Sequence, residues 1–252
     1  MTPALSWSVV AAVLFGALLH ASWNALIKAG DDQALDTALI HVLGCGVGAV
    51  LVLWVGLPNR EALPWLATSV VIHVGYYVTL VGAYKHGELG FAYPVMRGTA
   101  PLLVALLSGR LLGEHVPLAA WLGVAGISAG VLAIGLTRSA RETGSRRHAL
   151  GYALANAAII AAYTIVDGIG VRASGNALQY VALLGSCASL GAYGIALWAM
   201  TRAPVASVAA LRETSVLFAA LIGVFMLKER FRLQRAVGTG AIIAGVMALR
   251  LA

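Results

Sequence analysis

Residues Leu89–Glu114 read LGFAYPVMRGTAPLLVALLSGRLLGE, an apolar stretch with Arg97 well inside it. Its length exceeds the roughly 20 residues that a helix needs to cross about 30 Å of hydrocarbon. A related stretch, PVASVAALRETSVLFAALIGVFMLKE, follows at Pro204–Glu229. An offset of 115 positions aligns Arg97 with Arg212 and carries the "LLGE" ending of the first stretch onto the "MLKE" ending of the second.

The similarity extends into the next apolar segment of each half. The same offset pairs Gly123 with Gly238 and Gly130 with Gly245. A repeat that keeps one register through two segments predicts a chain built of two related halves. We expect the paired glycines to allow close packing between helices, as the GxxxG spacing of Gly126 and Gly130 also does. Gly44 and Gly48 have that spacing too.

The composition indicates a membrane protein. Apolar residues make up 60% of the chain and charged residues 11%, against about 25% charged in soluble domains. The net charge of +7 is concentrated between apolar runs, where basic residues orient a membrane protein and meet lipid headgroups, so nucleic-acid binding is not indicated. The two cysteines, Cys45 and Cys187, lie inside apolar runs and are expected to be small buried side chains rather than a disulfide.

The apolar runs predict an all-α integral membrane protein with nine transmembrane helices. The spans are expected at about Leu5–Ile27, Leu35–Gly56, Pro64–Tyr84, Leu89–Glu114, Leu118–Leu136, Ala149–Val171, Ala177–Met200, Val205–Leu227 and Leu233–Leu251. The domains are then a five-helix first repeat over residues 1–136, a basic linker over 137–148 and a four-helix second repeat over 149–252.

The register of the repeat indicates which helix the second half lacks. Trp23 and Tyr163 correspond at an offset of 140, while the later segments correspond at 115, so the second half is 25 residues shorter. That is about one membrane crossing, the counterpart of the second span. Nine spans put the Arg-rich linker and the basic loop Lys228–Arg235 on opposite faces, whereas the positive-inside rule favours one face for both. Either one of the two basic clusters is exposed on the outer side, or a half-span within 172–200 restores an even count.

Polar residues lie on single faces of the predicted spans, where an ionisable group costs about 2.5–3.5 kcal/mol to insert and therefore normally faces a protein interior or a wet cavity. Arg97 has no acidic residue within a turn or two on its own helix, and Pro94 and Pro101 loosen the backbone around it. His20 and Asp167 belong to similar stripes. Arg212 and Glu213 are adjacent, so we expect them to pair with different helices.

No motif of a nucleophile, paired carboxylates, a nucleotide-binding loop or a metal site occurs, so the sequence indicates neither an enzyme nor a cofactor. Transport without a nucleotide-binding loop would be driven by a gradient. His20, Asp167 and Glu213 are the candidates for carrying a coupling proton. A homo-oligomer is not indicated by the sequence.

The segments HASWNALIK (His20–Lys28), LLGE (Leu111–Glu114), FMLKE (Phe225–Glu229) and GAIIAGVMAL (Gly240–Leu249) resemble the drug/metabolite transporter superfamily, EamA type. The resemblance implies a ten-helix fold of two inverted repeats, here without the second helix of the second repeat. It also implies alternating-access export or import of a small metabolite across the bacterial inner membrane, with both termini in the cytoplasm.

The resemblance places the solute site at mid-membrane between the repeats. The residues that it implies for substrate binding are His20, Trp23, Asn24, Tyr77, Tyr93, Arg97, Tyr163 and Arg212. Asp167 and Glu213 are not in this list and stay candidates for carrying a coupling proton. Two alternatives stay open at this point: a degenerate or non-transporting membrane protein that serves as an assembly partner, motivated by the missing helix, and a flippase of lipid-linked sugars.

Overall fold

The computed structural model describes residues 6–29, 33–86, 89–136, 143–185, 195–218, 221–222 and 233–251. Within these ranges the protein is entirely helical and contains no strand. Many large apolar side chains lie on the outside of the bundle, such as Leu53 and Trp54, which are 87% and 86% exposed. Apolar surface of this kind is typical of a protein whose outer surface contacts lipid rather than water.

The first half forms the five expected long helices. They are α1 (Trp7–Ala29), α2 (Gln33–Val55), α3 (Leu63–His86), α4 (Leu89–Leu111) and α5 (Leu118–Leu136), with a short 3₁₀ helix, η1 (Arg60–Ala62), before α3. Each has 19 to 24 residues, enough to cross a bilayer.

The second half is less regular. Its labelled helices are α6 (Thr143–Ala173), α7 (Ala177–Leu184), α9 (Val205–Arg212) and α11 (Leu233–Leu251), and residues 195–200 and 215–218 are also helical. Helix α6 begins six residues before the expected Ala149, so part of the predicted linker 137–148 is helical. Among the described residues, two stretches pass a test for membrane spans that combines helix length with hydropathy, Arg60–Leu80 and Arg147–Ala173.

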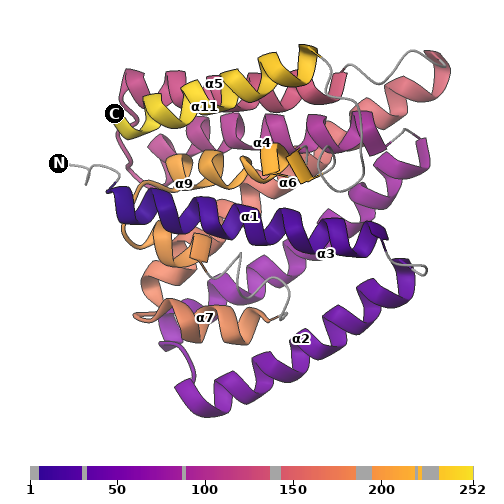
Figure 1. Ribbon diagram of the computed structural model, residues 1–252. Helices are drawn as coiled ribbons and strands as arrows, with labels where there is room; N and C mark the ends of the chain where they lie inside the picture. The colour runs from indigo at the N-terminus through magenta and orange to yellow at the C-terminus, as the bar shows by residue number, and fades with distance from the viewer. Residues whose placement is uncertain are drawn as a thin grey trace.

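The helix ends lie on two faces. One face, here called the terminal face, holds the start of α1 and the end of α11, because the Arg250 guanidinium lies 5.0 Å from the Trp7 ring (Figure 1). The opposite linker face holds the end of α3 and the start of α6, where the rings of His86 and His148 are 5.6 Å apart. An odd number of crossings would separate Trp7 from Arg250, so the predicted count of nine spans is wrong.

The segment Ala177–Met200, which was expected to be the seventh span, explains why the start of α1 and the end of α11 lie on one face. Arg172, at the end of α6, donates from Nε to the Met200 carbonyl at 2.8 Å. The segment therefore begins and ends on the terminal face, as a half-span would. Its first arm, α7, packs along α2: Gln179 Nε2 donates to the Val55 carbonyl at 2.6 Å near that face.

Helix α7 ends at Leu184, with Gly185 as its C-cap, well inside the bundle. The Gly185 carbonyl lies 3.9 Å from Cys45 Sγ on α2, ten residues from Val55. At 1.5 Å per residue, this depth is about 15 Å from the terminal face, near the middle of a bilayer. Cys45 itself is exposed on the outside of the bundle, so its expected burial is wrong, and Cys187 lies outside the described residues.

Glycines hold α5 against α11. A Cβ atom on Gly130 would lie 2.5 Å from the Gly238 carbonyl oxygen, and one on Gly245 would lie 2.6 Å from the Gly123 carbonyl oxygen. The predicted close packing at these glycines is confirmed. The repeat offset exchanges Gly123 with Gly238 and Gly130 with Gly245, so each of the two contacts is the repeat image of the other. The repeat thus maps the interface between α5 and α11 onto itself, as a two-fold relation between the two helices would.

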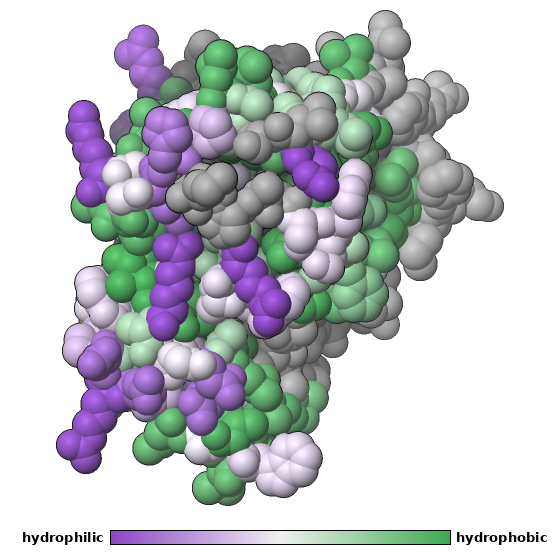
Figure 2. Space-filling view, turned by 90° about the vertical axis from the view of Figure 1, so that its left-hand side faces the viewer, coloured by the Kyte–Doolittle hydropathy of each residue, from purple (hydrophilic) through white to green (hydrophobic). Residues whose placement is uncertain are grey.

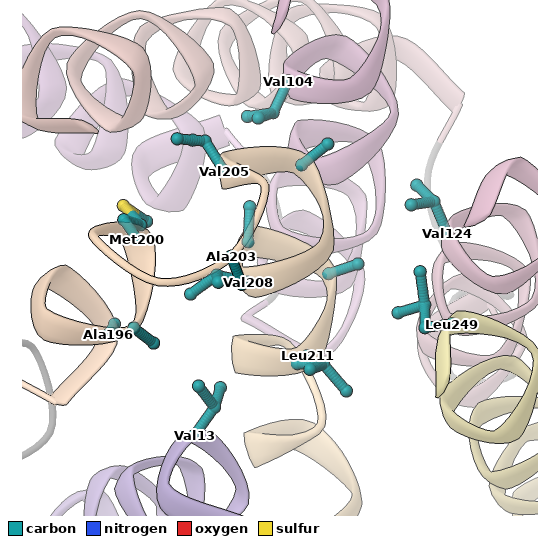
Figure 3. Packing of buried hydrophobic residues seen from close by; sticks show 14 of the residues in the cluster. Val13, Val104, Val124, Ala196, Met200, Ala203, Val205, Val208, Leu211 and Leu249 are labelled. Carbon is teal, nitrogen blue, oxygen red and sulfur yellow. The ribbon is translucent and has the colours of Figure 1, made fainter. Parts of the chain in front are cut away.

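Helix α9 occupies the middle of the apolar core. All of its residues from Val205 to Leu211 are buried, and Figure 3 shows Val205, Val208 and Leu211 on its turns with Val13 of α1 nearby. In Figure 1, α5 and α11 lie on one side of this core, and α7 and α2 lie on the other. The residues at the end of α9 are therefore enclosed by helices from both halves.

Candidate functional site

Arg97 of α4 connects three helices inside the bundle. Its Nη1 donates to Glu213 Oε1 at 3.2 Å, and its Nη2 lies 3.0 Å from Nε2 of His20 on α1. The Arg97 side chain is 13% exposed. Arg97 lies about 12 Å into α4 from the linker face, near the middle of a bilayer. One turn further on, Pro101 lacks the N–H group that would bond to the Arg97 carbonyl.

The helix that supplies Glu213 is interrupted at that residue. Helix α9 ends at Arg212, residues 213–214 form a turn, and the amides of Glu213 and Thr214 bond three residues back, to Ala210 and Leu211. The expected continuous span over Val205–Leu227 is therefore wrong at this point. Short 3₁₀ stretches inside a helix often mark functional hinges.

The interruption brings both arginines of the repeat to one carboxylate. Arg212 Nη2 lies 3.6 Å from Glu213 Oε1, the oxygen that Arg97 also contacts. Glu213 pairs with α4, and the turn also lets the neighbouring Arg212 and Glu213 side chains approach each other. Sequence reasoning had no signal for this turn, since Leu211–Ser215 contains neither proline nor glycine.

The cluster of Arg97, Arg212, Glu213 and His20, here called the central cluster, has more positive than negative charge. Two guanidinium groups face one carboxylate, and the Glu213 side chain is 2% exposed. Among the described residues, Glu213 Oε2 has no hydrogen-bond partner. A buried polar atom is costly unless it is hydrogen-bonded, so a hydrogen-bond donor is favoured at Oε2.

Aromatic side chains line the region beside Arg97. The Tyr93 ring centroid lies 5.6 Å from the Arg97 guanidinium carbon. Tyr163 of α6 stacks on His73 of α3 at 4.5 Å and meets the edge of Tyr76 at 6.1 Å. Tyr93 packs against the buried group that contains Tyr163, so the aromatic set continues from Arg97 to α3.

Asn156 fixes the position of α6 against α3. Its Nδ2 donates to the Tyr76 carbonyl at 2.9 Å and to Thr79 Oγ1 at 2.8 Å. His73 and Tyr76 were not among the residues implied for the site, although their helical spacing in the sequence places them on one face.

Asp167 and three further predicted residues lie elsewhere or cannot be placed. Asp167 is fully buried and accepts a hydrogen bond from the Tyr180 hydroxyl of α7 at 2.9 Å, an interaction that joins α6 to the half-span. The side chains of Trp23, Asn24 and Tyr77 lie outside the described residues. The structure therefore brings together His20, Tyr93, Arg97, Arg212 and Glu213, with Tyr163 in the adjoining aromatic set.

A second polar group, at the terminal face, was not predicted. Both carboxylate oxygens of Glu114, at 3.1 and 3.0 Å, accept from the Val205 amide at the start of α9. Arg172 Nη2 donates to Glu114 Oε1 at 2.7 Å. Because Pro204 provides no side-chain cap for α9, Glu114 from the first half satisfies an amide that the helix leaves free and offsets the positive end of its dipole. In the sequence, Glu114 stood out because the repeat aligns it with Glu229.

The described residues contain no group of three or more His, Cys, Asp or Glu side chains that could hold a metal ion. The arrangement is suited to binding a small polar solute by charge and hydrogen bonds.

Comparisons with known proteins agree with this architecture. A solved crystal structure aligns over 98% of both chains with a TM-score of 0.77 at 22% identity, which shows a shared fold. A search of curated proteins gave no significant match. The profile of the EamA-like transporter family matches residues 137–251, the predicted linker and second repeat. The family is part of the drug/metabolite transporter superfamily, and its members are integral membrane proteins. Residues 137–251 are therefore similar to the EamA-like transporter family, and this match covers somewhat less than half of the chain.

Proposed function

We propose that the protein carries a small organic solute with an anionic group across the bacterial plasma membrane, and that the solute binds to Arg97 and Arg212 at mid-membrane. The observation that carries this proposal is the shared carboxylate: Glu213 Oε1 lies 3.2 Å from Arg97 and 3.6 Å from Arg212. Both guanidinium groups lie at one carboxylate oxygen at mid-membrane, so an anionic group of the solute that binds beside them would meet positive charge.

Glu213 is the coupling group in this proposal. A solute anion and the Glu213 carboxylate compete for the same guanidinium of Arg97. Protonation of Glu213 would release Arg97 to the solute, so proton binding and anion binding would favour each other. Glu213 is better suited to this role than Asp167, whose described hydrogen bond goes to Tyr180 rather than to the central cluster.

Two helix interruptions support alternating access around this site. Helix α7 ends at Leu184, with its C-cap Gly185 about 15 Å from the terminal face, and α9 ends at Arg212 after eight residues from the same face. Discontinuous helices that end near the bilayer midplane are typical of secondary transporters with repeated halves. The symmetric glycine contacts between α5 and α11 support an inverted-repeat relation between the halves.

Solute-dependent stability tests the proposal. The purified protein in detergent is heated with pooled organic acids, amino acids, amines and nucleotides, beside Arg97→Gln and the matched control Arg110→Gln. Arg110 is an exposed arginine near the end of the same helix. A ligand at 100 times its dissociation constant adds about 2.7 kcal/mol to the unfolding free energy. We expect anionic compounds to stabilise the parent and Arg110→Gln but not Arg97→Gln.

Counterflow in liposomes then separates transport from binding. Stabilisation by an anion without counterflow of that anion would favour the non-transporting alternative. Stabilisation by neutral or cationic solutes alone would contradict the role assigned to the two arginines. The described ends of the segment Ala177–Met200 lie together on the terminal face, and an even number of crossings does not require a further full helix.

A further inference from the structure

A cavity separate from the central cluster lies between α1, the end of α6, α7 and residues 195–202. Its volume is about 870 Å³, within the range of small-molecule sites. None of the residues of the central cluster lines it. Its described walls bring together Ala12, Phe15 and Leu19 of α1 with Leu178 and Val181 of α7.

The cavity is open to the bilayer along its apolar side. Phe15, Leu19 and Leu178 are 55%, 38% and 46% exposed although they line it. Ala12, Phe15 and Leu19 follow one side of α1, and the seven helical steps from Ala12 to Leu19 span about 10 Å along the helix axis. The apolar part therefore reaches from near the terminal face into one leaflet.

The polar part of the cavity lies at the terminal face and is basic. Arg172 and Arg202 line it; Arg172 also pairs with Glu114, which does not line the cavity. Arg202 is exposed and its guanidinium lies 5.0 Å from the centroid of the Trp198 ring, which also lines the cavity. Figure 2 shows hydrophilic side chains grouped on this face with apolar side chains at its edge.

An apolar groove of one-leaflet depth with two arginines at its interfacial end matches the shape and charge of an anionic amphiphile. Basic pockets between transmembrane helices bind anionic lipid headgroups. We propose that this groove binds an anionic phospholipid of the leaflet at the terminal face, with an acyl chain between α1 and α7 and the phosphate at Arg172 and Arg202. Because α7 is the half-span beside α2, the bound lipid would fill the space along the outer side of that segment.

Native mass spectrometry of the purified full-length protein tests the headgroup. Retention of phosphatidylglycerol and phosphatidylcholine is compared at equal lipid concentration for the parent, Arg202→Gln and the control Arg110→Gln, an exposed arginine that does not line the groove. We expect phosphatidylglycerol to bind more tightly than phosphatidylcholine. Arg202→Gln should weaken phosphatidylglycerol binding about fivefold, while Arg110→Gln leaves it unchanged. Equal weakening by both variants, or equal binding of the two lipids, would overturn the assignment.

A second pair of variants tests the acyl chain. Ala12→Phe adds a ring inside the groove, whereas Ala11→Phe adds the same ring at the neighbouring exposed position outside it. Retained phosphatidylglycerol should fall in Ala12→Phe and not in Ala11→Phe. The melting temperature of each lipid-free variant shows whether it is folded. If Ala12→Phe proves unfolded, Phe15→Ser, which removes apolar wall from the exposed side of the groove, replaces it. Unchanged lipid retention in a folded wall variant would refute the acyl position.

Discussion

The guanidinium of Arg97 lies 3.2 Å from the carboxylate of Glu213, although the two residues are 116 positions apart and belong to different halves of the chain. This ion pair joins α4 to α9 inside the bundle. Because Arg212 approaches the same carboxylate oxygen, the pair is part of a shared cluster rather than an isolated salt bridge.

The first prediction concerns the stability of this pair. Removing one partner of a buried pair leaves an uncompensated charge and costs on the order of 3 kcal/mol. Glu213→Gln should destabilise more than Arg97→Gln, because it removes the carboxylate that both arginines contact, whereas Arg97→Gln leaves Arg212 beside Glu213. Unfolding in detergent should show that the double variant Arg97→Gln/Glu213→Gln is more stable than the sum of the single effects implies. Additive effects would mean that the two side chains do not interact.

The second prediction concerns the carboxylate that caps α9. Glu114→Ala removes the acceptor of the Val205 amide and the partner of Arg172, so it should lower the free energy of unfolding by about 2–3 kcal/mol. Glu114→Gln keeps one acceptor oxygen and should cost less. Glu61→Ala, an exposed glutamate near the same face, is the control and should change stability little. Equal melting temperatures for Glu114→Ala and Glu61→Ala would show that the cap contributes nothing.

The third prediction compares two glycines on one helix. A Cβ atom at Gly245 would lie 2.6 Å from a backbone oxygen of α5, while one at Gly240 would meet nothing within 4 Å. Gly245→Ala should therefore separate α5 from α11 and cost about 1–3 kcal/mol. Gly240→Ala should be neutral or stabilising by up to about 1 kcal/mol, because alanine is the better helix former. Melting temperatures of the two variants measure the difference, and a loss of stability in Gly240→Ala equal to that in Gly245→Ala would contradict the packing explanation.

The repeat explains which features the sequence could predict. The register between the halves singled out Gly123, Gly130, Gly238 and Gly245, and these are the residues at the contact of α5 with α11. It also singled out Arg97 and Arg212, which lie in one cluster. Hydrophobic runs of bilayer length located the five helices of the first half because each of them is a continuous helix.

The features that the sequence did not predict are breaks within apolar runs. Hydropathy shows that Ala177–Met200 is apolar, but it cannot distinguish one crossing from a segment that returns to the same face. The contact of Arg172 with the Met200 carbonyl, which settles the direction, depends on tertiary packing. The turn at Glu213 also has no local signal, and without it Arg212 and Glu213 would point to different sides of a helix.

The fourth prediction concerns orientation in the membrane. The described helix ends at the linker face carry Lys28, Lys85, Arg146, Arg147 and Arg235, and the sequence has five further lysines and arginines in the segments that directly precede α6 and α11. The terminal face carries five: Arg60, Arg110, Arg172, Arg202 and Arg250. The conflict raised by nine crossings is removed, since the start of α6 at Thr143 and the start of α11 at Leu233 lie on one face.

The positive-inside rule then predicts that the linker face is cytoplasmic and that Trp7 and Arg250 lie on the outer side. This is opposite to the cytoplasmic termini that the family resemblance implies. Single cysteines at Arg60 and Arg147, introduced after Cys45 and Cys187 are replaced by alanine, test the orientation in intact cells with a membrane-impermeant thiol reagent. We expect labelling of Arg60→Cys in intact cells and of Arg147→Cys only after permeabilisation. The reverse pattern would show that the family orientation outweighs the charge difference between the faces.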